Sequence, residues 1–205
     1  MRTLDPRLPG LVILASTAVF VTLKRWTTGS FLKGKPEGGF ALWLTHVFNL
    51  FFLAVVNPAV ATLMVARRWE NLDPTIVNPG PMPLYLVLET IGILLSLAGN
   101  ALMGWALVTM RGRFQVLGNR PRPSDRLLLS GPYRLVRHPM YASVLGQSLG
   151  LAFLTQSLAI VMLFWIYVKL FQSLIAFEEE GLRRAYGEEF AAYQSQVRKL
   201  IPLLY

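Results

Sequence analysis

Residues 140–177 read MYASVLGQSLGLAFLTQSLAIVMLFWIYVKLFQSLIAF, and this stretch decides the fold of the chain. It holds two apolar runs, 140–154 and 158–177, which are separated only by the uncharged triplet Thr-Gln-Ser. So short a break predicts a tight turn between two helices that cross a membrane. Because a helical hairpin returns both of its ends to one surface, the segments before residue 140 and after residue 177 are expected to be neighbours in space.

Three further apolar runs, 11–23, 40–66 and 84–110, precede the hairpin. The chain is 54% hydrophobic and 15% charged, whereas a soluble domain carries about 25% charged residues. We therefore predict an all-α integral membrane protein with about five transmembrane helices, the last two of which form the hairpin. The run 40–66 contains Pro58, which is expected to bend its helix.

The last segment, residues 178–205, is charged but still periodic. Its apolar and aromatic side chains recur at helical spacing, at Tyr186, Phe190, Tyr193, Val197 and Ile201. This spacing predicts a C-terminal amphipathic helix that lies against the membrane or the protein. The chain, 1–205, is thus expected to form a single membrane domain, with three transmembrane helices in 1–110 and a polar loop, the hairpin and the amphipathic helix in 111–205.

The basic residues are distributed unevenly between the two ends of the predicted helices. The side that holds loops 24–39 and 111–137 and the tail carries fifteen Lys and Arg residues, and the other side carries four. Cytoplasmic loops are rich in these residues, so this side is predicted to face the cytoplasm, in the inner membrane of a bacterium or the endoplasmic reticulum of a eukaryote. The net charge of +9 then indicates contact with membrane lipids and not with nucleic acid. With no cysteine and only His46 and His138 as histidines, no metal site is predicted.

The loop that enters the hairpin reads GPYRLVRHPMYASVLG, residues 131–146. Pro139 suits the first turn of a helix, which places His138 just before a helix N-terminus, where free N–H groups and the helix dipole favour an anion. Tyr133 and Tyr141 offer flat faces for an aromatic base or a cation. The alternative is a basic loop at the membrane interface that binds no specific ligand.

The other end of the hairpin reads FEEEGLRRAYGEEFAAY, residues 177–193, with three adjacent glutamates. Glu179 with Arg183, and Glu180 with Arg184, are spaced as i,i+4 pairs, so solvated salt bridges on a helix explain at least one of the glutamates. The other interpretation is that one carboxylate faces a cation bound by the histidine-bearing loop.

A resemblance to a known family rests on two motifs, LLLSGPYRLVRHPMYASVLG (127–146) and EEEGLRRAYGEEFAAYQSQVRKLIP (178–202). Together they resemble the isoprenylcysteine carboxyl methyltransferases and their relatives, the phospholipid methyltransferases. The resemblance implies an integral membrane enzyme that transfers a methyl group from S-adenosylmethionine to a lipid-like or prenylated acceptor, by carboxyl O-methylation or by phospholipid N-methylation. The chain has no glycine-rich Rossmann fingerprint, which agrees with the cofactor site of that family.

The resemblance also assigns roles residue by residue. The cofactor site in the loop and the tail would comprise Leu128, Leu129, Gly131, Tyr133, Arg137, His138, Pro139, Tyr141 and Glu178 or Glu179. The implied catalytic residues are Glu178 and Glu179, which would lie near the amino group or sulfonium, and Arg184, which would hold the methyl acceptor. The chain departs from the family pattern at Ala142-Ser143, where relatives often have a glycine.

Two other functions fit parts of the pattern. A membrane reductase of the sterol-reductase type would use NADPH and shares a related C-terminal half, including an ending similar to IPLLY. Such reductases usually have more spans and a longer chain. A non-enzymatic membrane scaffold would use the basic loop to bind anionic lipid.

Overall fold

The structure is a computed structural model that describes residues 5–28, 39–77, 81–110 and 126–201; the side chain of His46 lies outside the described residues. The described chain is built of helices, as predicted: α1 (Arg7–Thr28), α2 (Gly39–Phe51), α3 (Asn57–Val65), the short α4 (Trp69–Leu72), α5 (Met82–Met110), α6 (Pro139–Thr155) and α7 (Leu158–Gln196). Four of the five apolar runs each fall within one of these helices, and the run 40–66 is divided between α2 and α3.

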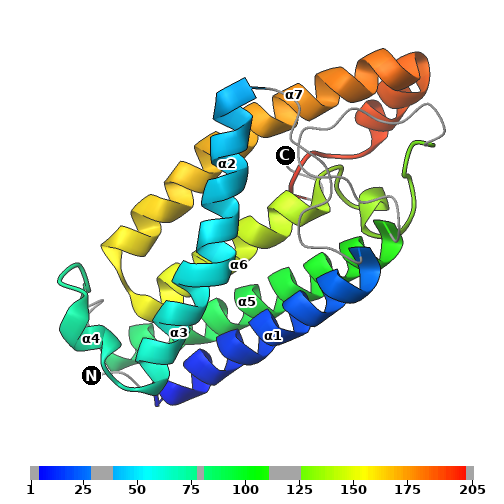
Figure 1. Cartoon of the computed structure of the whole chain (residues 1–205). Coiled ribbons are helices and arrows are strands. Elements are labelled where there is room, and N and C mark those ends of the chain that lie inside the picture. Colours follow the sequence, from blue (N-terminus) through cyan, green and yellow to red (C-terminus); the bar gives the residue numbers. More distant parts are fainter. Residues whose placement is uncertain (1–4, 29–38, 78–80, 111–125, 202–205) are drawn as a thin grey trace.

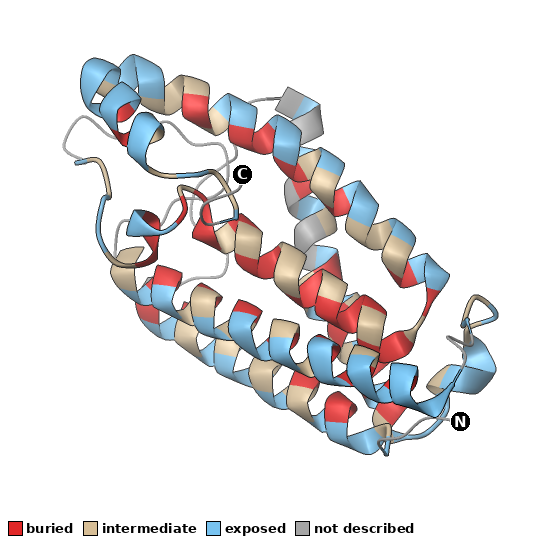
Figure 2. Ribbon diagram, turned by 180° about the vertical axis from the view of Figure 1, so that it is seen from behind, coloured by how far each residue is buried: buried red, intermediate tan, exposed pale blue. Residues whose placement is uncertain are grey.

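Among the described residues, three helices are long and apolar enough to cross a bilayer, over Arg7–Thr27, Met82–Met110 and Leu158–Gln196. α6 has 17 residues and is shorter than the roughly 20 that a single crossing needs. Many large apolar side chains on the outer faces are exposed, among them Leu94 and Trp165. Figure 2 shows these exposed faces around an inner layer of buried residues. An apolar exterior of this kind suits a lipid environment.

The second apolar run is not one bent helix. α2 is followed by a π-helical turn at Phe52–Val56, and α3 begins at Asn57. The ring of Pro58 displaces the carbonyl four residues earlier, which lies inside this turn, and the wider turn accommodates it. The expected disturbance by Pro58 is therefore present, but it lies on the N-terminal side of the proline as a change of helix type.

In Figure 1, α1, α5 and α6 lie side by side, and α7 runs back from the far end of α6. α5 and α6 approach closely through small residues. A Cβ atom on Gly92 would lie 2.9 Å from the carbonyl oxygen of Gly150, and one on Gly99 would lie 2.8 Å from that of Ser143. Close backbone approach of this kind is how helices associate in membranes, where the hydrophobic effect does not drive them together. α6 is thus packed firmly against α5.

The predicted hairpin is confirmed. α6 ends at Thr155, Gln156 adopts a left-handed conformation (φ 55°), and Ser157 caps α7 by accepting a hydrogen bond from the amide of Ile160 at 3.3 Å. The segment after α4 holds this turn in place. The amide of Val77 donates to the carbonyl of Gln156 at 2.9 Å.

α7, with 39 residues, is longer than a single membrane crossing requires. At 1.5 Å per residue, its apolar part, residues 158–177, already spans the roughly 30 Å hydrocarbon core, so Glu178 and the residues that follow lie outside it. α7 continues without interruption to Gly187, whose non-helical backbone (φ 52°, ψ −120°) kinks the helix. Residues 188–196 are therefore a second helix that folds back at this kink, so the predicted C-terminal helix is present, but it begins after Gly187 and not at residue 178.

The helical tail also ends earlier than predicted. The helix stops at Gln196, and Val197 is extended (φ −118°, ψ 133°). Phe190 and Tyr193 of the predicted apolar stripe are buried, whereas Ile201 is exposed. The stripe therefore holds only within the helix.

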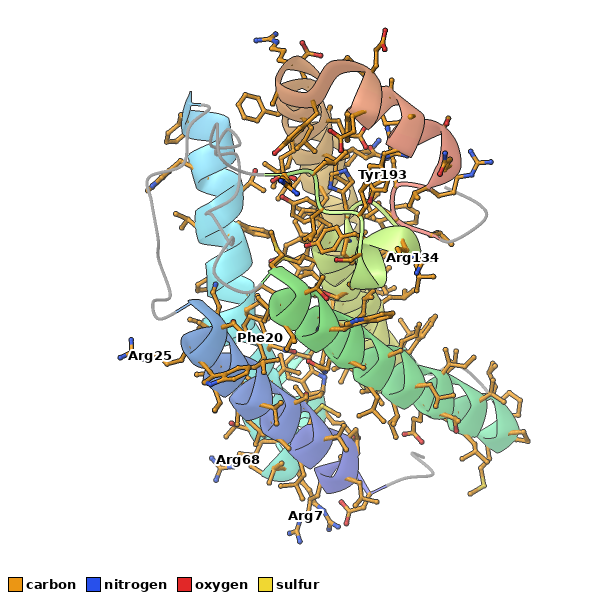
Figure 3. The ribbon with its side chains drawn as sticks, turned by 90° about the vertical axis from the view of Figure 1, so that its right-hand side faces the viewer. Arg7, Phe20, Arg25, Arg68, Arg134 and Tyr193 are labelled. Carbon is orange, nitrogen blue, oxygen red and sulfur yellow. The ribbon has the colours of Figure 1, made fainter. Side chains whose placement is uncertain are left out.

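The segments before and between the helices lie at the ends of the bundle where the prediction of successive membrane crossings places them. At one end Arg67 pairs with Asp5 at 2.5 Å, and in Figure 3 Arg7 and Arg68 project from this part of the molecule. Arg134 and Tyr193 lie near the opposite end in the same view. The loop before α6 and the tail after α7 are thus brought together, as a hairpin requires.

Candidate active site

The loop before α6 is tied to the C-terminal tail by its backbone. A 3₁₀ turn at Gly131–Arg134 leads into Val136, which forms a parallel bridge with Arg198. The amide of Arg137 donates to the carbonyl of Arg198 at 2.7 Å, and that of His138 donates to the carbonyl of Lys199 at 3.0 Å. These bonds fix the direction in which the side chains of residues 137 and 138 project.

His138 occupies the position predicted for it, directly ahead of α6. It is the N-cap residue, Pro139 follows it in the first turn, and no side chain caps the helix. The His138 ring is buried and stacks on the ring of Tyr141, with centroids 5.7 Å apart and planes at 25°. The Tyr141 ring packs in turn on Phe171 of α7, at 4.8 Å. The histidine is thereby held between the two arms of the hairpin.

Glu179 is the centre of a buried polar cluster. Its Oε1 accepts hydrogen bonds from Arg137 Nε at 2.9 Å and from His138 Nε2 at 3.1 Å, and Arg137 Nη2 lies 2.9 Å from the same oxygen. Its Oε2 accepts from Gln194 Nε2 at 3.1 Å and lies 4.0 Å from Lys199 Nζ. The Glu179 side chain is 8% exposed. A buried carboxylate is stable only when paired in this way.

The electrostatics of Glu179 follow from these contacts. Burial by itself would raise the pKa of the carboxyl group, but the hydrogen bonds and positive charge of His138 and Arg137 outweigh it and lower that pKa to about 2. Glu179 is therefore ionised at neutral pH, and its negative charge is shared among donors on the loop and the tail.

Glu178 has different surroundings from its neighbour. Its Oε1 accepts a hydrogen bond from the Tyr141 hydroxyl at 2.5 Å, and its Oε2 lies 3.6 Å from His138 Nδ1. The Glu178 side chain is 23% exposed, about three times as much as that of Glu179. The two ring nitrogens of His138 thus face two adjacent carboxylates, one of which is more open to a ligand.

Most of the residues assigned from the sequence meet in this cluster or support it. Hydrogen bonds and ion pairs link Arg137, His138, Tyr141, Glu178 and Glu179 in one connected cluster. Pro139 and Tyr133 are buried beside them in the chain, and Gly131 has a positive φ of 61° that begins the 3₁₀ turn. The hydroxyl of Tyr193 holds this turn by donating to the carbonyl of Tyr133 at 2.6 Å.

Three predicted residues stand apart from the cluster. Leu129 is exposed and Leu128 half-buried, so neither side chain is enclosed with the glutamates. Arg184 donates from Nε to Glu180 at 2.8 Å, and its side chain is 72% exposed. Glu180 also accepts from Arg183, so the helix salt bridges expected for one glutamate belong to Glu180. The cofactor and acceptor roles of the three residues stay predictions.

Sequence reasoning missed the contribution of Gln194 and Lys199. Helical periodicity places both off the apolar stripe, which indicates a solvated face. The kink at Gly187 turns this part of the helix so that Gln194 reaches Glu179. Glycine inside a helical pattern is the signal that could have found them, since it marks a position where the helix can bend.

Comparison with known proteins gives one family match and several similar proteins. A family model described as phospholipid methyltransferase matches residues 88–189. The cobalt-zinc-cadmium resistance protein CzcN of Cupriavidus metallidurans is 32% identical over 152 residues, which cover 73% of this chain and 61% of that protein. A protein of Oryza sativa subsp. indica with the name "Probable protein-S-isoprenylcysteine O-methyltransferase" is 27% identical over 159 residues, or 72% of this chain and 83% of that protein.

A solved structure has a similar fold. It is that of a eukaryotic intramembrane Ras methyltransferase, isoprenylcysteine carboxyl methyltransferase, which aligns with a TM-score of 0.54 over 95% of this chain and 85% of that one. The two sequences are 20% identical, so this likeness shows the arrangement of helices. The segment matched by the family model contains the loop before α6 and both glutamates, and it ends before Gln194.

Proposed function

Because the chain belongs to the family of integral membrane methyltransferases that includes the phospholipid and isoprenylcysteine carboxyl methyltransferases, we propose that it methylates a lipid-like or prenylated acceptor with S-adenosylmethionine as the donor. The observation that carries the proposal is the meeting of Arg137, His138 and Tyr141 with Glu178 and Glu179 at the open end of the hairpin. The proposed orientation places this end of the bundle at the cytoplasmic face, where a polar donor is available.

The residues present fit the chemical groups of that donor. Its sulfonium and amino groups are cationic, and the partly exposed carboxylate of Glu178 is an acceptor of matching charge. Its carboxylate is anionic, and the N-terminus of α6, which no side chain caps, favours an anion. The stacked rings of His138 and Tyr141 provide the kind of flat surface on which an adenine can pack.

The methyl group of S-adenosylmethionine is already activated, because its carbon–sulfur bond breaks with the electron pair going to sulfur as the acceptor's lone pair forms the new bond. The protein therefore needs chiefly to align the reactants and to exclude water. A carboxylate acceptor loses no proton, and an arginine such as Arg184 could orient it through two hydrogen bonds. An amine acceptor must be neutral to react, and Glu178 could take up its proton.

The first experiment separates this proposal from the two alternative functions. Purified protein in lipid nanodiscs is titrated with S-adenosylhomocysteine, NADPH or anionic phospholipid, and its melting temperature is followed. At a hundredfold excess over the dissociation constant, a ligand of the folded state stabilises it by about 2.7 kcal/mol. We expect S-adenosylhomocysteine to raise the melting temperature. A rise with NADPH alone would point to a reductase, and a rise with anionic lipid alone would point to a scaffold.

The second experiment tests the acceptor and the role of Arg184. Transfer of a labelled methyl group is measured to an S-farnesylcysteine derivative with a free carboxyl group and, separately, to an ethanolamine phospholipid. We expect Arg184→Ala to abolish transfer while S-adenosylhomocysteine still binds. Unchanged turnover in this variant would remove Arg184 from the mechanism and leave its observed pair with Glu180 as its function.

A further inference from the structure

We propose that the adjacent glutamates have different tasks: Glu179, together with Arg137, is a positioning residue that fastens the tail 188–201 over the loop, and Glu178 is the carboxylate that faces the methyl donor. The inference rests on the proposed function for the identity of the donor. It reassigns Arg137 and Glu179, which the sequence placed among the cofactor ligands, and it adds a tail segment that lies largely outside residues 88–189 matched by the family model.

The hydrogen-bonding groups of Arg137 are engaged by the protein itself. Nε and Nη2 contact Glu179 Oε1, and Nη1 donates to the carbonyls of Gln194 and Val197. All three guanidinium nitrogens thus have partners, and the side chain is 8% exposed. A guanidinium in this state would have to give up buried partners before it could bind a ligand, and leaving buried carbonyls and a carboxylate unpaired is costly.

Glu179 and Glu178 have hydrogen-bond partners in different parts of the chain. Glu179 accepts hydrogen bonds at both oxygens, from residues of the loop and from Gln194 of the tail. Glu178 contacts Tyr141 and His138, which belong to the entrance of α6. Its larger exposed fraction, 23% against 8%, leaves a surface that a ligand can reach.

The tail is fastened at its far end by this cluster and is joined to the rest of α7 by a kink at Gly187. Gly187 has a positive φ of 52°, and a Cβ atom built there would meet none of the described atoms within 4 Å. Beyond it, Phe190 and Tyr193 are buried, and the backbone of Arg198 and Lys199 accepts hydrogen bonds from residues 137 and 138. The fold-back therefore depends on the loop contacts, which include the buried Arg137–Glu179 pair.

The two roles separate in experiment because they predict changes in different observables. Hydrogen exchange of the full chain in nanodiscs reports the tail, since the amides of Arg137 and His138 are protected by the carbonyls of Arg198 and Lys199. Binding of S-adenosylhomocysteine reports the donor site. The variants are Arg137→Lys, Glu179→Gln and Glu178→Gln, with the exposed Glu189→Gln as the matched control on the tail.

We expect both Arg137→Lys and Glu179→Gln to raise the hydrogen-exchange rate in residues 134–138 and 188–201 by at least about tenfold. A lysine cannot reach Glu179 and both carbonyls at once, and a glutamine lacks the negative charge that pairs with Arg137. Glu178→Gln should leave this exchange at the wild-type level and weaken binding of S-adenosylhomocysteine, which keeps the amino group of the donor but not its sulfonium, by about tenfold or more. Glu189→Gln should change neither observable. Circular dichroism and gel filtration of each variant establish that it is folded.

The inference is overturned if the tail of Arg137→Lys and Glu179→Gln stays as protected as in the wild type, or if Glu178→Gln binds the ligand with wild-type affinity. Failure of the proposed function would look different. In that case the wild-type protein would not bind S-adenosylhomocysteine at all, while the exchange of the tail in the Arg137 and Glu179 variants would still rise.

Discussion

Replacement of Gly131 by alanine is expected to be among the most damaging single-methyl changes at the site end of the molecule. Gly131 begins the 3₁₀ turn with φ 61°, and a Cβ atom there would lie 2.5 Å from Thr109 Oγ1, 3.0 Å from Thr109 Cγ2 and 3.2 Å from Trp105 Nε1. The substitution therefore adds two separate penalties. One is the left-handed backbone, which costs an L-residue about 1–2 kcal/mol, and the other is overpacking against the end of α5, which costs about 1–3 kcal/mol.

Two other glycines of the chain separate these penalties. Gly187 has a similar positive φ, but nothing would lie within 4 Å of a Cβ atom at that position, so Gly187→Ala should show only the backbone cost. Gly181 lies in α7 with no positive φ and no atom within 4 Å, so Gly181→Ala should stabilise the protein by about 0.5–1 kcal/mol. Gly181→Ala is thus expected to be more stable than the wild type, and both Gly187→Ala, with φ 52° and ψ −120°, and Gly131→Ala are expected to be less stable.

The measurement is reversible unfolding in mixed micelles, followed by circular dichroism. Gly131→Ala should lose about 2–5 kcal/mol in total, and in a Thr109→Ala background its cost should fall to the backbone part, because both close Thr109 atoms are gone. No relief of the loss in the Thr109→Ala background would refute the packing argument. Activity is compared per folded molecule, so that a loss of stability is not counted as a loss of catalysis.

Three further perturbations test other parts of the structure. Tyr141→Phe removes the hydroxyl that donates to Glu178 at 2.5 Å, and calorimetric titration should show S-adenosylhomocysteine affinity reduced by about tenfold with little change in melting temperature. The pKa of Glu179 is lowered to about 2 from 4.5, so the stability that its ionised form contributes is complete above about pH 4.5 and is lost as the pH falls toward 2. The free energy of unfolding of Glu179→Gln, measured against pH, should therefore decline less between pH 5 and pH 3 than that of the wild type. Ser157→Ala removes the cap of α7 at the opposite end and should lower the free energy of unfolding by about 1 kcal/mol without altering methyl transfer per folded molecule; an altered rate would show that the two ends are coupled.

The hairpin and its consequence could be predicted because they depend on properties that the sequence displays directly. Two apolar runs joined by three uncharged residues can form few other structures in a membrane, and the return of their ends places His138 beside Glu178 and Glu179 whatever the details of packing. The position of Pro139 likewise predicts the start of α6. Both predictions rest on features of a short stretch of sequence, namely the length of the apolar runs and the position of a proline.

The details of the site could not be predicted, because they depend on contacts between residues that are far apart in the sequence. Arg137 is bound by the carbonyls of Gln194 and Val197, and every residue carries a carbonyl, so no residue type signals this contact. Periodicity treats a helix as straight, and the positive φ of Gly187 rotates everything after it out of register. The π-helical turn ahead of Pro58 is a similar case, since the proline predicts a disturbance and not its form.

The location of the candidate site suits the two solvents that the proposed reactants require. A charged donor is soluble in water, an acceptor with a lipid-like tail is soluble in the bilayer, and the reacting atoms can meet only where the two phases adjoin. Charged groups at that boundary are stable when they are partly outside the hydrocarbon and mutually paired. Placing the glutamates directly after the apolar part of α7, and His138 directly before that of α6, satisfies both conditions with a single hairpin. In the proposed function, a tail folded over the same end would cover the reacting groups without adding another membrane helix, and the contacts of Arg137 with Glu179, Gln194 and Val197 hold the tail there.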